Sequence, residues 1–125
     1  MANGGTQGLH GKQLTDAISA AMVELYAEHY GHDRTTATTY INDNVVLCIL
    51  EGILSVREDE QIAEGRSTEV IDGRVTFQEN TEDEFTAAIE RLTQRKVTAF
   101  LSANQTAPGV ACELFFLEAP PASGP

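Results

Sequence analysis

The feature that most constrains the fold is a pair of short apolar runs, 45–50 and 110–117, each preceded by turn-forming residues. The segment 35–41, before the first turn, is rich in β-branched residues, and 96–103, before the second, partly alternates apolar and polar residues. Strand-like segments joined by Asn, Asp, Pro or Gly are typical of β-hairpins. The sequence therefore predicts two hairpins, the second with a turn over 104–109.

The run 45–50 is apolar at every position, whereas a strand with one solvated face alternates apolar and polar residues. The preceding residues 42–44 read Asn-Asp-Asn, and both residue types tolerate the positive φ of tight turns. We therefore expect 45–50 to lie inside the sheet, or to have one face covered by a partner subunit.

Helices are expected before and between the hairpins. Residues 13–30 carry apolar side chains at helical spacing and are followed by Gly31, a residue type that ends helices at little conformational cost. Ser55 and Glu58 have the spacing of a capping box, which predicts a short helix ending near Gly65.

A long helix is expected over 67–93. Gly73 and Asn80 weaken it, so a bend or break there would cost the least free energy. The resulting order is α-β-β-α-α-β-β. This order predicts an α+β fold, a two-layer sandwich in which helices cover one face of a four-stranded, mainly antiparallel sheet.

The chain of 125 residues suits a single domain. We expect this domain over 12–118, flanked by disordered tails at 1–11, which is rich in glycine, and 119–125, which is rich in proline. The pattern of helix, strand, turn and apolar strand occurs twice, with Cys48 and Cys112 in comparable places. This repeated pattern is explained either by a duplication or by chance.

The net charge is −11, from 19 acidic and 8 basic residues. Because phosphate backbones are held by Lys and Arg, this balance argues against nucleic-acid partners and anionic membrane surfaces. No stretch approaches the ~20 apolar residues of a membrane span, and 1–11 lacks the pattern of a signal peptide. A cytoplasmic protein without direct membrane insertion is expected.

Both cysteines lie in strongly apolar runs. We interpret them as small hydrophobic residues of the core, with a disulfide or a redox role as alternatives. Two isolated thiols do not make a metal site.

The densest group of functional residue types is the polar cluster His29, His32 and Asp33. Such a group can bind a transition metal, but Gly31 separates the two histidines and His29 falls on the apolar stripe of its helix. A hydrogen-bonded core histidine is the favoured interpretation. Neither a metal nor another cofactor is predicted.

A second candidate is a ligand-binding set of Arg66, Arg74 and Gln78. Arg74 and Gln78 are one helical turn apart, and a guanidinium group can hold a carboxylate or phosphate with two parallel hydrogen bonds. The alternative is an intramolecular salt bridge to one of the many carboxylates. No phosphate loop, nucleophile elbow or zinc-ligand spacing is present, so we predict no catalytic residues and favour a non-enzymatic role.

Several short segments carry a family resemblance through their order and spacing. They are Tyr30-Gly31, Tyr40-Ile41-Asn42-Asp43, Val45-Val46, Leu50-Glu51-Gly52-Ile53-Leu54-Ser55, Glu58, Ala63-Glu64-Gly65-Arg66, Arg74-Val75-Thr76-Phe77-Gln78, Arg95-Lys96-Val97-Thr98-Ala99-Phe100-Leu101-Ser102 and Glu113-Leu114-Phe115-Phe116-Leu117-Glu118. Together they resemble the DUF2294 family, also called the MpsC-like domain. The chain departs from its pattern at Asp33-Arg34, where Gly-Pro is expected, and at Gln94, where Gly is expected.

The resemblance implies an association with Na⁺-translocating systems that generate membrane potential and are linked to inorganic-carbon uptake. The leading hypothesis is an accessory or regulatory protein that forms a homodimer through its sheet and docks on a membrane transport complex. The alternative is a sensor of a small anion or nucleotide, using the arginine and glutamine set. An enzyme with His29 or His32 as general base is a third hypothesis.

Overall fold

The structure, a computed structural model, describes residues 10–31, 34–106 and 108–119, without the side chains of residues 30, 56, 67 and 71–80. Both predicted tails lie largely outside these ranges. The elements follow in the order α1 (Lys12–Tyr30), β1 (Thr36–Asn42), β2 (Val45–Glu51), α2 (Val56–Ala63), α3 (Ser67–Thr93), β3 (Val97–Thr106) and β4 (Gly109–Leu117). The predicted α-β-β-α-α-β-β order is confirmed.

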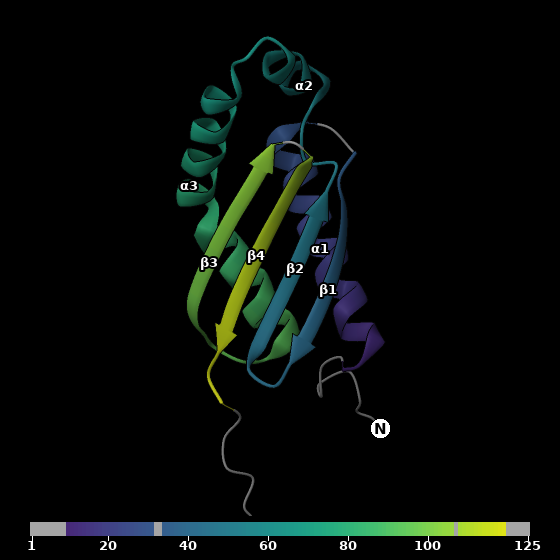
Figure 1. The fold of residues 1–125 in the computed structure, drawn as a ribbon. Coiled ribbons are helices and arrows are strands. Elements are labelled where there is room, and N and C mark those ends of the chain that lie inside the picture. The colour runs from purple at the N-terminus through teal and green to yellow at the C-terminus, as the bar shows by residue number, and fades with distance from the viewer. Residues whose placement is uncertain (1–9, 32–33, 107, 120–125) are drawn as a thin grey trace, which may run out of the picture.

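The strands form one antiparallel sheet in the order β1-β2-β4-β3. Helix α1 packs against β1 and β2, and α3 packs against β3, so both helices lie on the same side (Figure 1). This arrangement confirms the two-layer α+β sandwich. Strand β2 is central in the sheet, as its continuous apolar sequence predicted.

The helix ends follow the local sequence signals. Gly31 takes the left-handed conformation, with φ 73°, and donates its backbone N–H to the Ala27 carbonyl at 2.9 Å. The Ser55 hydroxyl accepts the Glu58 N–H at 3.2 Å, and the Glu58 carboxylate accepts the Ser55 N–H at 2.9 Å, which confirms the capping box. Helix α3 continues from Ser67 to Thr93 without the break considered for its middle.

The second turn is shorter than the sequence predicted. Residues 104–106 belong to β3, where Asn104 pairs with Ala111 and Thr106 with Gly109. Continued pairing satisfies backbone groups that a six-residue loop would leave to water. Gly109 packs closely against the segment between β2 and α2. A Cβ at this position would lie only 2.9 Å from Leu54 Cγ, which favours glycine there.

The core lies between the sheet and the helices and is mainly aliphatic. Its largest fully buried side chains come from both layers: Tyr26 and Phe85 from the helices and Phe115 from β4. The rings of Tyr26 and Phe85 stack with their centroids 5.9 Å apart. No helix within the described ranges combines the length and apolarity needed to cross a membrane.

Candidate functional site

The face of the sheet that points away from the helices, here the outer face, is almost free of charge. Strand residues alternate between the two faces, so those between the buried positions point outward. Only Glu51 is charged among them. The outer face comprises Thr36, Thr38, Tyr40, Asn42, Val45, Leu47, Ile49, Glu51, Ala99, Leu101, Ala103, Gln105, Val110, Cys112, Leu114 and Phe116.

Large apolar side chains form a continuous stripe across this outer face. Tyr40, Leu47, Leu114 and Leu101 are successive cross-strand partners from β1 to β3. Tyr40 is 57% exposed, Leu101 58% and Phe116 37%. Within the described chain, neither α1 nor α3 covers this face, which is turned toward the viewer in Figure 1. A broad exposed apolar patch of this kind marks an association surface.

The opposite, inner face carries a buried polar row among the core residues. Thr39, Cys48 and Glu113 are successive cross-strand partners, and all are buried. Two side chains of α1 reach this row: Tyr26 donates its hydroxyl to Glu113 Oε2 at 2.8 Å, and the hydroxyls of Ser19 and Thr39 lie 2.7 Å apart. Burying a carboxyl group is costly unless it is hydrogen-bonded, so the Tyr26 contact is part of what keeps Glu113 inside.

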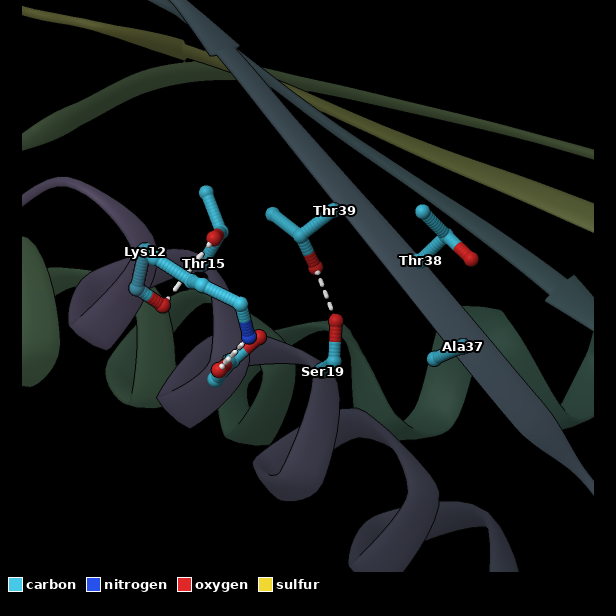
Figure 2. A pocket seen from close by; sticks show the side chains of 7 residues that line it. Lys12, Thr15, Ser19, Ala37, Thr38 and Thr39 are labelled. Carbon is cyan, nitrogen blue, oxygen red and sulfur yellow. Dashed lines mark hydrogen bonds and ion pairs between the residues drawn. The ribbon is translucent and has the colours of Figure 1, made fainter.

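The row ends at a recess of about 470 Å³ between α1 and the edge strand β1. Figure 2 shows two of its lining residues, Ser19 of α1 and Thr39 of β1, pointing toward each other, while Thr38 points elsewhere from the same strand. Lys12 at its rim pairs with Asp16 at 2.6 Å. Because the Lys12 amine is already paired, we interpret the recess as a polar contact between helix and sheet.

The two cysteines lie on opposite faces. Cys48 is buried on the inner face, as predicted, and both thiols are free, so the disulfide alternative is wrong. Burial raises the pKa of Cys48 to about 12, although the Thr39 hydroxyl hydrogen bond partly opposes this. Cys112 is only partly buried, and desolvation raises its pKa too. Cys48 pairs with Glu113, whereas Cys112 pairs with Ile49, the next residue of β2. Because neighbouring residues of a strand point to opposite faces, Cys112 lies on the outer face, and the core position predicted for it is wrong.

The predicted anion-binding residues are only partly visible. Arg66 precedes α3 and pairs with Glu69 at 3.0 Å and with Glu64 at 3.4 Å. The hydrogen bond that the Arg66 guanidinium donates to the Glu69 carboxylate is the main reason why the pKa of Arg66 is raised. The side chains of Arg74 and Gln78 lie outside the described part of the chain. Their joint binding of an anion stays a prediction.

Of the predicted polar cluster, only His29 is described; His32 and Asp33 lie outside the described ranges. His29 is at the surface rather than in the core, where it meets Glu84 of α3. Its Nε2 atom lies 3.1 Å from Glu84 Oε2 on α3 and 3.6 Å from Glu28 Oε1 on its own helix.

Arg95, which follows α3, has a structural role at one end of the sheet. Its guanidinium group donates to the Asp43 carbonyl at 3.0 Å and to Asn44 Oδ1 at 2.6 Å, both in the β1–β2 turn. It also donates to the Glu118 carbonyl at 3.1 Å, after β4. Three segments distant in sequence are thereby joined at one end of the sheet, which no local signal indicates.

Comparison with known protein families gives a match. The family described as Na⁺-translocating membrane potential-generating system (MpsC) matches residues 10–119, which span every helix and strand of the structure. No curated protein and no solved structure matches the chain.

Proposed function

This chain belongs to the MpsC family, and we propose that it is an accessory protein of a Na⁺-linked membrane-potential system that self-associates through the outer face. The observation that carries the self-association is the uncharged apolar stripe of Tyr40, Leu47, Leu114 and Leu101. A second copy of this chain is the proposed occupant of that surface.

Charge favours a second copy meeting at this face. Two chains of net charge −11 repel one another over most of their surfaces. The outer face carries a charge only at Glu51, near the end of β2. Contact there brings apolar groups together while the carboxylates stay apart and solvated.

The size of the outer face is also adequate. Four strands about 4.8 Å apart, with the lengths of β1 to β4, give a projected area on the order of 500 Å². The accessible surface of a side-chain-covered sheet exceeds its projection, and standard interfaces bury about 800 Å² per partner. Two such sheets can pack face to face as in a β-sandwich, about 10 Å apart.

A non-enzymatic role fits the chemistry of the thiols. Nucleophilic cysteines have a lowered pKa, in an electropositive and accessible environment. In this chain the pKa of both Cys48 and Cys112 is raised by desolvation. The link to a membrane transport complex rests on the family description alone.

Self-association is tested by light scattering of the purified chain across micromolar concentrations. We expect a dimer for the unaltered chain and for Ala20→Lys, whose exposed site is on α1, and a monomer for Ala103→Lys and Leu101→Lys on the outer face. A monomeric unaltered chain at all concentrations, or equal behaviour of Ala20→Lys and Ala103→Lys, would sink the proposed dimer.

The transport link needs a separate experiment. The tagged chain is used to capture partners from membranes of its native cells in mild detergent, with Leu101→Lys in parallel. Recovery of a cation-transport subunit by the unaltered chain supports the accessory role. Capture that recovers no transport component counts against it, whatever the oligomeric state.

A further inference from the structure

A group of metal-ligating side chains joins the end of α1 to the middle of α3, away from the outer face. Glu28 and His29 belong to α1 and Glu84 to α3, and their ligand atoms all lie within 4.8 Å of one another. His29 Nε2 lies 3.1 Å from a carboxylate oxygen of Glu84 and 3.6 Å from one of Glu28.

These spacings suit a common metal ion. In a tetrahedral zinc site, bonds of about 2.0–2.1 Å place neighbouring ligand atoms roughly 3.3 Å apart. Both His–Glu distances fall within a few tenths of an ångström of that value. We propose that Glu28, His29 and Glu84 bind a divalent transition-metal ion of the Zn²⁺ type.

The ligand types select the class of ion. Carboxylates alone suit Mg²⁺ and Ca²⁺, whereas an imidazole nitrogen favours Zn²⁺ and its transition-metal neighbours. The side chains are open to solvent, with His29 28% exposed, so water can complete the coordination as it does in three-ligand zinc sites.

The charge at the cluster favours a dication. Two carboxylates lie close to one imidazole, and a dication offsets the negative charge of both. Arg91 competes for these carboxylates, since it lines a groove of about 320 Å³ between α1 and α3 together with Glu24 and Glu84. Glu24 adds a further negative charge beside Arg91, so the neighbourhood keeps an acidic excess.

Binding would add metal coordination to the packing and the His29–Glu84 contact that already join α1 and α3. An ion held only by the native state stabilises it in proportion to the logarithm of its concentration above the dissociation constant. Zn²⁺ should therefore raise the midpoint of thermal unfolding, and chelator should reverse the rise.

The test uses the full chain stripped with chelator and titrated with Zn²⁺ by calorimetry, with Co²⁺ absorption as a second readout. We expect one ion per chain and at least a tenfold loss of affinity in His29→Ala and Glu84→Gln. The matched controls His10→Ala and Glu82→Gln, at exposed sites outside the cluster, should bind as the unaltered chain does.

Zinc affinity that survives in both His29→Ala and Glu84→Gln would overturn the proposal, and so would an unaltered chain that binds no Zn²⁺. Circular dichroism of each variant separates loss of a ligand from loss of fold. The result is independent of dimer formation, because the cluster lies on the helical layer and the proposed dimer contact on the opposite layer.

Discussion

The two faces of the sheet are built from the same strands and have opposite relations to water. On the inner face, Phe115 is fully buried, and even the polar row of Thr39, Cys48 and Glu113 is buried. On the outer face, Phe116, the next residue in the chain, is 37% exposed. Both faces are rich in apolar groups, so apolar content alone does not tell which face is the core. The covering helices make that distinction.

The largest expected difference between the faces is in core stability. Phe115→Ala should lower the free energy of unfolding by ~3–5 kcal/mol, because it leaves a cavity in a packed interior. Phe116→Ala should cost less than ~1 kcal/mol in a monomer. Urea denaturation in the Leu101→Lys background measures both without a contribution from self-association.

Equal losses for the two phenylalanine variants in that background would contradict the distinction between the faces. A large loss for Phe116→Ala only in the unaltered background would instead assign its role to the dimer. The comparison therefore separates folding from association at adjacent residues.

The next difference concerns thiol reactivity. A rise of the Cys48 pKa from 9.0 to about 12 lowers its thiolate fraction near neutral pH about a thousandfold. Iodoacetamide at pH 8 should therefore label Cys112 first, and Cys48 only after unfolding, as read by mass spectrometry. Labelling of Cys112 should slow as protein concentration rises, unless Leu101→Lys is present.

The same pKa shift gives a pH dependence with a definite sign. The unfolded Cys48 thiol ionises near pH 9.0 while the folded one holds its proton to about 12, so its contribution to stability is complete below pH 9 and is lost as pH rises toward 12. Comparison of Cys48→Ala with the unaltered chain across that range isolates the effect.

Faster labelling of Cys48 than of Cys112 in the folded chain would contradict the assignment of the faces.

The smallest expected difference is between two tyrosines. Tyr26→Phe removes the hydroxyl that donates to Glu113 Oε2 and should cost ~1–3 kcal/mol, since a buried acceptor loses a donor. Tyr40→Phe, on the exposed outer face, should change the free energy of unfolding by no more than ~0.5 kcal/mol. Chemical denaturation of both variants in the Leu101→Lys background provides the measurement. An unchanged Tyr26→Phe would mean that the Glu113 carboxyl is satisfied by its other surroundings.

Local sequence signals predicted the elements well, because each depends on residues a few positions apart. The capping box of Ser55 and Glu58, the helix end at Gly31 and the bounds of α3 are of this kind. The prediction failed at 104–106, where pairing with β4 outweighs the turn preference of Asn104. It also failed at Cys112, because the similar places of Cys48 and Cys112 in their apolar runs gave no information about strand register.

The candidate sites were harder to predict, since their residues are distant in sequence. Glu84 is 55 residues from His29, and Glu113 is 87 residues from Tyr26. Neither glutamate stands out among the many carboxylates of the chain. The predicted neighbours of His29 were those close in sequence, whereas its described partner on α3 is supplied by helix packing.

The sequence by itself determined the order of helices and strands, their caps and the acidic character of the chain, because periodicity, turn chemistry and charge are local or additive properties. Only the tertiary structure decided which face of the sheet is core, which cysteine is buried and which carboxylates meet Tyr26 and His29. Those outcomes depend on strand register and helix packing, where a shift of one residue turns every side chain of a strand to the opposite face.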